Sequence, residues 1–392
     1  MDRPDPRRHH PRPRRPFGER HHDVSTETGL DQEAARLRVK LVQALVDAGD
    51  LTDPAWRDAF ESVPRHTCVP YFYDHTGRTI AADDPETRHQ WLRAVHENRQ
   101  LVTHRTDGSA TSSSSMPSLM ARMLEALQVT NGMHVLEVGT GTGYNAALLA
   151  HRLGDASVVT IDVSSDITGP ARERLAAAGH RPLVLTGDGA FGWPDKAPYD
   201  RIMVTCRLRT VPLELVRQVP LDGFILAPLG NALARIRRVG ALVAQGWFLP
   251  GGAFFMPLRR GAVDGQPTRR PALPDAVGRP TRLPVAAIAD NDFRFLVSIA
   301  VPGLTWQYDL DDERKPTGAR VWAPDGSIAQ LKADGTVAEA GPRNLWSALE
   351  GAYDTFLGAG APGPERYGAV ITEATQRVWL DTPGGPSWDL TQ

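Results

Sequence analysis

The sequence predicts an α/β fold whose main part is a doubly wound parallel sheet, followed by a smaller C-terminal α+β domain. Three observations indicate this. An apolar run at residues 135–138 passes directly into a glycine-rich turn that opens a helix. Further apolar runs alternate with helical segments, as parallel strands joined by crossover helices require. Two of the runs end near Asp162 and Asp188, at the strand ends where such sheets bind ligands.

The expected elements follow in order along the chain. After the first strand and a helix that starts near Tyr144, a second strand is expected at 157–162. Pro170 and Gly179 then bound a helix, because proline favours a helix's first turn and glycine its end. Strands are expected at 183–189, 199–205 and 224–230, with two more within 241–258 around a turn at 250–252. Amphipathic helices are expected at 37–48 and 118–127.

The composition divides the chain into four parts. Residues 1–30 are expected to be a disordered basic tail, because residues 1–23 hold seven Arg against four acidic residues and have no apolar side chains besides proline, Met1 and Phe17. The main domain is expected at 31–262. Residues 263–284, rich in Pro, Gly and Arg, predict a linker. In the C-terminal domain at 285–392, turn sequences at 323–326 and 333–335 predict hairpins, and a helix is expected from Leu345 to Phe356.

Charge, cysteine and histidine content argue against several classes of protein and of site. The net charge of -2 gives no reason to expect a nucleic-acid or membrane partner. The tail has no apolar stretch and is not expected to be a signal peptide. With only Cys68 and Cys206, a disulfide framework is not expected, and the cytoplasm is the expected compartment. The scattered histidines form no metal-ligand pattern.

The glycine turn at 139–143 predicts a ligand site. Glycines at alternate positions let the backbone approach a ligand closely, and helix N–H groups can face it. The order here is G-x-G-x-G, not the G-x-G-x-x-G of dinucleotide sites. Glu137 just before the turn would repel a pyrophosphate and suits a ligand with a cationic end, such as a sulfonium amino acid. Another nucleotide, or a turn without a ligand, stays open.

Asp162 ends the second predicted strand, 23 residues after Gly139. In a doubly wound fold, a carboxylate at this place binds the hydroxyls of a ribose. Asp162 is therefore the expected ribose ligand.

Several strings together resemble the protein-L-isoaspartate O-methyltransferase family over roughly residues 35–260. They are L-E-V-G-T-G-T-G-Y-N-A-A at 136–147, G-D-G at 187–189, G-W-P at 192–194 and A-P-Y-D-R-I at 197–202. Outlying matches are V-P-R at 63–65 with V-P at 69–70, S-S-S-M-P at 113–117 and F-M-P-L at 255–258. The resemblance implies a Rossmann-like class I methyltransferase sheet. It also implies S-adenosyl-L-methionine as the methyl donor and S-adenosyl-L-homocysteine as the product.

The resemblance also assigns roles to residues. It implies that the donor contacts the serine run, the glycine turn and the strand-end acids: Ser112, Ser113, Ser114, Glu137, Gly139, Thr140, Gly141, Gly143, Asp162, Asp188 and Gly189. Ser115 matches the serine of the family's T-I-S-Q-P and is the expected catalytic residue, orienting the acceptor carboxylate. Its alternative is a loop serine in a low-complexity run. Arg259 is a candidate for the substrate side or else a surface arginine. No metal is implied.

Two departures from the family pattern bear on the acceptor. About forty residues separate Val69-Pro70 from the serine run, and about 130 follow Leu258. This long form resembles the methyltransferases that accompany ribosomally made peptides, beside ATP-grasp ligases (graspetides) or lanthipeptide synthetases. The resemblance implies methylation of an ordinary aspartate in a macrocyclic precursor, whose ester closes to an aspartimide.

Three interpretations of the function remain open, and they differ in the peptide or protein that is bound. The expected partners are the modified precursor peptide and the associated macrocyclase, with residues 285–392 recognising the peptide. Repair of isoaspartate in aged proteins needs the same donor site, and activity on a generic isoaspartyl peptide would favour it. A non-catalytic peptide-binding protein is the third reading, which Glu137, Asp162 and Asp188 argue against.

Overall fold

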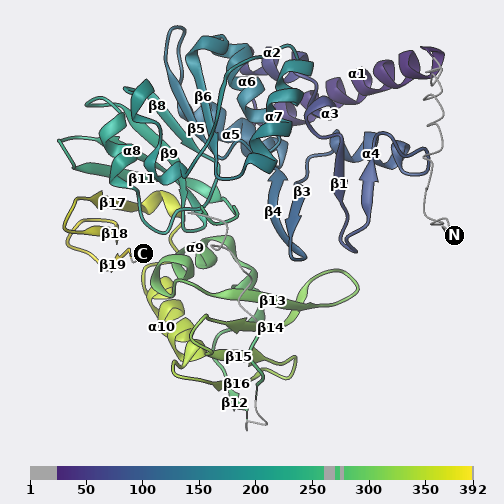
Figure 1. Ribbon diagram of the computed structural model, residues 1–392. Coiled ribbons are helices and arrows are strands. Elements are labelled where there is room, and N and C mark those ends of the chain that lie inside the picture. Colours follow the sequence, from purple (N-terminus) through teal and green to yellow (C-terminus); the bar gives the residue numbers. More distant parts are fainter. Residues whose placement is uncertain (1–23, 260–269, 274–277, 391–392) are drawn as a thin grey trace, which may run out of the picture.

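The computed structural model describes residues 24–259, 270–273 and 278–390, and its core is a ten-stranded mixed sheet (Figure 1). The sheet order is β19-β18-β17-β11-β10-β9-β8-β5-β6-β7. Its parallel half confirms the doubly wound arrangement and consists of β5 (Val135–Val138), β6 (Val158–Asp162), β7 (Leu183–Thr186), β8 (Arg201–Val204) and β9 (Phe224–Leu229). The chain reverses its strand order between β5 and β8, which is where such sheets open a crevice for a ligand.

Helices cover both faces of this half of the sheet. Along β5 the side chains alternate, so that Leu136 and Val138 enter one hydrophobic cluster and Val135 enters the other. The first face packs against α8 (Leu213–Gln218), and the second against α5 (Pro117–Leu127) and α6 (Tyr144–Leu153). Glu137 belongs to the second face and is therefore buried beneath α6.

The helix that follows β6 starts earlier than the sequence indicated. α7 spans Ser165–Ala177, so Pro170 lies inside it and not at its first turn. Ser164 is the N-cap, and its side chain accepts a hydrogen bond from the Asp166 N–H. The capping serine therefore sets the start of this helix.

The C-terminal residues extend the central sheet. β10 (Ala232–Arg238) and β11 (Ala244–Gly252) form an antiparallel hairpin, so one strand replaces the two expected within 241–258. The outer edge of β11 pairs with β17, and the strands there are β17 (Tyr367–Ile371), β18 (Gln376–Leu380) and β19 (Ser387–Asp389). The expected C-terminal domain at 285–392 is therefore not one separate unit, because its last strands cover an edge of the methyltransferase sheet.

The N-terminal elements form a second layer with its own small sheet, of order β2-β1-β3-β4. They are α1 (Val24–Asp47), α2 (Pro54–Ser62), α3 (Arg65–Cys68), β1 (Tyr71–Tyr73), β2 (Thr79–Ala81), α4 (Arg88–Val95), β3 (Leu101–Thr106) and β4 (Ser109–Ser114). Helix α1 begins at Val24, inside the range 1–30 expected to be a tail. Residues 1–23 lie outside the described part of the chain.

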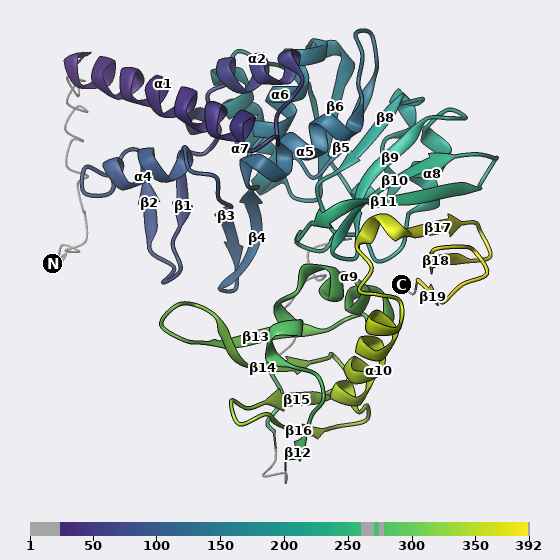
Figure 2. The ribbon, with the colours of Figure 1, turned by 180° about the vertical axis from the view of Figure 1, so that it is seen from behind.

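A C-terminal module, residues 278–358, lies below the central sheet in Figures 1 and 2. It comprises β12 (Arg279–Pro280), η4 (Val285–Ala289), α9 (Asn291–Ala300), β13 (Thr305–Leu310), β14 (Pro316–Trp322), β15 (Ile328–Leu331), β16 (Thr336–Ala340) and α10 (Leu345–Gly358). Both expected hairpins and the expected helix are present. Strand β12 falls within the expected linker, of which residues 263–269 and 274–277 are outside the described chain.

The module shares a hydrophobic core with the central sheet. Phe295 of α9 lies 4.8 Å from Phe248 of β11 between ring centroids, and 5.0 Å from Tyr367 of β17. Helix α9 therefore connects the module to the antiparallel half of the sheet.

The remaining described elements are short 3-10 helices: η1 (Asp155–Ser157), η2 (Gly189–Phe191), η3 (Pro194–Lys196) and η5 (Pro364–Arg366). Among the described helices, none has the length and apolar character needed to cross a membrane.

Candidate active site

The glycine turn between β5 and α6 is shaped by what surrounds each glycine. Gly139 has φ +104°, and a Cβ there would lie 2.4 Å from the Thr205 hydroxyl at the end of β8. Gly141 has φ +52° and donates its N–H to Asp162 Oδ2 at 3.0 Å. At Gly139 both the backbone and the space require glycine, whereas at Gly141 the positive φ favours it. The conformation of the turn is therefore fixed by its contacts with the ends of β8 and β6.

A buried polar network lies beneath the turn. Glu137 is fully buried, and its carboxylate accepts hydrogen bonds from Asn145 Nδ2 at 2.7 Å and from the Thr160 hydroxyl at 2.6 Å. Thr160 in turn contacts the Thr140 hydroxyl at 2.7 Å. The Asn145 Oδ1 atom is buried without a hydrogen-bond partner. A buried acceptor without a partner is costly, so this atom is positioned to receive a donor from a ligand.

Burial changes the titration of this network. It raises the pKa of Glu137 to about 7 from 4.5, against the opposing effect of the hydrogen bonds from Thr160 and Asn145. The carboxylate thus becomes anionic in the neutral pH range. A cationic group bound beside it would favour the anionic form.

We expect Glu137→Gln to change how stability depends on pH. Because the folded-state pKa of Glu137 is raised, the native protein holds this proton between pH 4.5 and about 7 while the unfolded chain has released it. The free energy of unfolding of the wild type should therefore fall relative to the variant as pH rises through this window, by about 1.4 kcal/mol per pH unit at most, and the difference should level off above it. Urea unfolding of both proteins from pH 4.5 to 8 measures this, and a pH-independent difference would contradict the raised pKa.

Asp162 ends β6 beside the turn, as expected from the sequence. Its carboxylate accepts the N–H of Gly141 at 3.0 Å and that of Val163 at 2.8 Å. Burial raises the pKa of Asp162, while these hydrogen bonds and the charge of Arg259 act in the opposite direction. Both carboxylate oxygens keep free lone pairs for hydroxyl donors.

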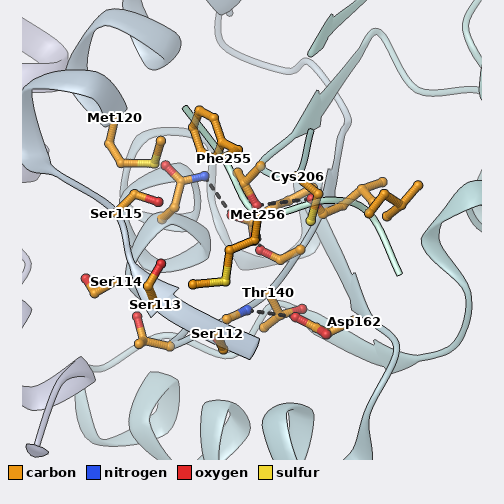
Figure 3. A pocket seen from close by; sticks show the side chains of 18 of the residues that line it. Ser112, Ser113, Ser114, Ser115, Met120, Thr140, Asp162, Cys206, Phe255 and Met256 are labelled. Carbon is orange, nitrogen blue, oxygen red and sulfur yellow. Dashed lines mark hydrogen bonds between the residues drawn. The ribbon is translucent and has the colours of Figure 1, made fainter. Parts of the chain in front are cut away.

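A pocket joins the turn to the serine run and to the chain after β11. It is lined by residues 111–116, 137–142 and 161–163, by Gly189, by Thr205 and Cys206, and by 254–259, among others. Figure 3 shows Asp162 and Thr140 on one side of this pocket, Met120 and Phe255 toward the other, and Met256 between them. The pocket therefore has a polar end at the strand termini and an apolar end at α5 and residues 254–256.

The four serines have different environments. Ser114 is buried, and its hydroxyl contacts the Arg65 guanidinium at 3.2 Å. The Ser113 hydroxyl accepts a hydrogen bond from Gln100 Nε2 at 3.0 Å. Ser115 is held by its backbone carbonyl, which accepts from Arg65 Nη2 at 3.1 Å. In Figure 3 Ser115 lies beside Met120 at the apolar end of the pocket, and Ser112 lies near Thr140 and Asp162.

Arg65 holds this segment in place, a role that its V-P-R string at 63–65 did not predict. It is 1% exposed and donates to the carbonyls of Val95, Glu97 and Arg99 as well as to the serine run. Burial lowers the pKa of Arg65 to about 10, so it stays charged at neutral pH. Within the described chain its charge is met by hydroxyl and carbonyl oxygens, with no ion pair.

Three of the expected site residues have structural contacts that differ from the ligand contacts expected of them. Gly143 is the N-cap of α6, and a Cβ there would lie 3.1 Å from Leu175 Cγ, so it serves helix packing beside the pocket. Asp188 accepts the Ala190 N–H at 2.8 Å and caps η2, leaving its neighbour Gly189 to line the pocket. Arg259 donates to the Thr111 carbonyl at 3.2 Å and acts on Asp162 through its charge. It therefore lies nearer the polar end than the expected substrate side.

Other lining residues were not foreseen in the sequence. Asn145, Arg122 and Phe254 all border the pocket. The sequence places Asn145 one residue after the start of the helix, but only the structure shows that its side-chain oxygen is buried without a hydrogen-bond partner.

Cys206 also lines the pocket, and burial raises the pKa of its thiol to about 12, so it is protonated at neutral pH. Cys68 is buried in the N-terminal core, as expected. Within the described chain no group of His, Cys, Asp or Glu could hold a metal ion.

The fold and the pocket define a methyltransferase of the doubly wound class. The glycine cradle, the Asp162 carboxylate and the free Asn145 oxygen beside Glu137 fit a ligand with a ribose and a cationic amino-acid end. The family model of protein-L-isoaspartate(D-aspartate) O-methyltransferase matches residues 36–244, and the chain belongs to this family. It is therefore a protein carboxyl O-methyltransferase that uses S-adenosyl-L-methionine.

Individual relatives agree with this assignment. The protein-L-isoaspartate O-methyltransferase of Ignicoccus hospitalis is 34% identical over 192 residues, which are 48% of this chain and 80% of the relative. That of Methanoculleus marisnigri is 33% identical over 230 residues, covering 57% and 91%. A solved structure titled protein-L-isoaspartate O-methyltransferase superposes with a TM-score of 0.52 at 22% identity, over 88% of this chain and 100% of the other. This last similarity concerns the fold alone.

Proposed function

We propose that the enzyme methylates the side-chain carboxylate of an aspartate in a ribosomally made, macrocyclic precursor peptide, and that the ester then closes to an aspartimide. In the closure, the backbone nitrogen of the following residue attacks the ester carbonyl and methanol leaves. An aspartimide that later takes up water can open to isoaspartate. The partners are then the modified precursor and, upstream of it, the macrocyclase.

The pocket residues are suited to carboxyl methylation without a strong base. When bound, S-adenosyl-L-methionine supplies an electrophilic methyl group whose bond to sulfur breaks with the electron pair going to sulfur. An aspartate carboxylate with a pKa near ~4 is already anionic at neutral pH. Ser115 can donate one hydrogen bond that orients it, and the Met120 and Met256 side chains exclude water around it. Such alignment contributes up to about 7–11 kcal/mol in well-oriented systems.

The observation that carries the proposal is the composition of the acceptor end. Phe255 and Met256 border the pocket and belong to the F-M-P-L string that resembles the family pattern, whereas Phe254 borders the pocket directly before that string. Phe254 in turn contacts Arg294 of the C-terminal module, 4.3 Å from ring centroid to guanidinium carbon. The C-terminal module thus contacts a residue that borders the pocket, which supports an acceptor that is recognised in part by residues outside the family match at 36–244.

Isoaspartate repair is the second candidate, and the comparisons favour it. The curated relatives carry that name, and a solved structure of the same name superposes on 88% of this chain. The residues after Leu258 therefore do not by themselves separate the two functions. Assaying methyl transfer to a linear isoaspartyl peptide, its aspartyl counterpart and a macrocyclic aspartyl peptide separates them. The proposal expects turnover of the macrocycle, whereas turnover confined to the isoaspartyl peptide would contradict it.

A further inference from the structure

An arginine is held between aromatic rings at the mouth of the pocket. The Arg294 Cζ atom of α9 lies 4.3 Å from the Phe254 ring centroid and 5.7 Å from that of Tyr308 on β13. Trp306, on the same face of β13, stacks on Tyr308 with centroids 5.9 Å apart and planes at 11°. We call these four side chains the Arg294 clamp. Because Phe254 is exposed and lines the pocket, the clamp leads from the active site onto the C-terminal module.

The charge of Arg294 is not neutralised. Within the described chain its guanidinium makes the two ring contacts and has no hydrogen bond or ion pair to a carboxylate. Three other arginines of the module are paired: Arg279 with Glu350 at 2.9 Å, Arg282 with Asp354 at 2.5 Å and Arg343 with Asp325 at 2.6 Å. The rings fix the orientation of the Arg294 cation, while its N–H donors stay available to an anion.

The strand that carries the clamp has a free edge. Strand β13 is the last strand of the five-stranded sheet, and among the described strands it pairs with β14 alone. An edge strand offers a row of unpaired backbone groups to which an extended peptide can add. An acidic side chain on such a peptide would meet Arg294. A carboxylate is the complementary group for a guanidinium held in a fixed orientation.

We propose that the Arg294 clamp and the free edge of β13 bind an acidic, extended segment of the acceptor peptide next to the residue that is methylated. This inference rests on the proposed function only in taking a peptide as the acceptor, whether aspartyl or isoaspartyl. The clamp selects acceptors by charge in the flanking segment, and the pocket handles the carboxyl group itself.

Peptide binding measured by calorimetry in the presence of S-adenosyl-L-homocysteine tests this without requiring turnover. The probes are two series of synthetic decapeptides, one with a single aspartyl and one with a single isoaspartyl residue. In each series one glutamate is moved through the flanking positions, and glutamine replaces it in the matched peptide. The wild type should bind the glutamate peptide roughly tenfold tighter at one or more positions, since a hydrogen bond to a charged group commonly contributes this much.

Two variants make the result specific. Arg294→Gln should remove the preference for glutamate while keeping the affinity for S-adenosyl-L-homocysteine. Arg282→Gln, the matched control, removes an exposed arginine paired with Asp354 and should keep the preference. Equal binding of the matched peptides to the wild type, a preference that survives in Arg294→Gln, or no binding of any peptide would overturn the inference. A wrong acceptor in the proposed function would appear instead as methylation of the isoaspartyl series alone.

Discussion

Replacing Arg65 by methionine should lower the free energy of unfolding by about 3 kcal/mol and abolish most methyl transfer. The variant leaves the carbonyls of Val95, Glu97, Arg99 and Ser115 without their donor in a buried site. Each unsatisfied buried acceptor costs about 1–3 kcal/mol, offset in part because the buried charge is also removed. Activity should fall further than stability explains, because Ser115 loses the bond that holds its backbone.

Urea unfolding and initial rates at a temperature where the variant stays folded measure these two effects separately. Arg57→Met is the matched control, since Arg57 is exposed and pairs with Glu61 at 2.8 Å on the surface of α2. Such a surface pair contributes only about 0.2–1 kcal/mol. If both arginine variants lost similar stability, Arg65 would not be the anchor of the serine segment.

Ser115→Ala should slow methyl transfer by roughly tens to hundreds of times while leaving the affinity for the donor nearly unchanged. Its hydroxyl makes no hydrogen bond to the described protein, lines the pocket and lies beside Met120 at the apolar end. Losing one positioned donor to a reacting oxygen commonly costs this much in rate. The loss should therefore appear in turnover with the acceptor peptide.

Single-turnover rates and calorimetry with S-adenosyl-L-homocysteine distinguish this role from donor binding. Ser109→Ala is the control on the same strand, because Ser109 lies at the far end of β4 and does not line the pocket. We expect that variant to keep nearly the full rate. A parallel loss of donor affinity and rate in Ser115→Ala would instead place the Ser115 hydroxyl at the donor.

The parallel half of the fold and the polar end of the site could be predicted because their signals are local. The spacing of Gly139 and Gly141 defines a turn, and Asp162 at a strand end follows from the alternation of strands and helices. The family resemblance, supported by the match over residues 36–244, added the donor. These features depend on neighbouring residues, which a single sequence displays.

The other parts of the fold and of the site depend on contacts between segments that are distant in the sequence, and these could not be predicted. The pairing of β17 with β11 joins residues more than a hundred positions apart, so the sequence pattern suggested a separate domain. Arg65 bonds to Ser115 across 50 positions, and Arg294 meets Phe254 only after the module has packed. The start of α7 was misplaced for a local reason, since the Ser164 cap competed with the proline signal of Pro170.

The shared sheet also changes how the role of the C-terminal residues can be tested. Deleting everything after the linker would remove β17–β19 and uncover the edge of β11. Loss of activity in such a truncation would reflect a damaged sheet as much as lost recognition. Point variants of the Arg294 clamp avoid this difficulty.

Mass spectrometry of an aspartyl peptide, incubated with the enzyme and S-adenosyl-L-methionine in its linear and in its macrocyclic form, tests the proposed function most directly. For the cyclised peptide we expect a transient gain of one methyl group, followed by loss of methanol that leaves the peptide one water lighter than at the start. A stable methyl ester on that peptide, or methylation confined to isoaspartyl peptides, would contradict the account.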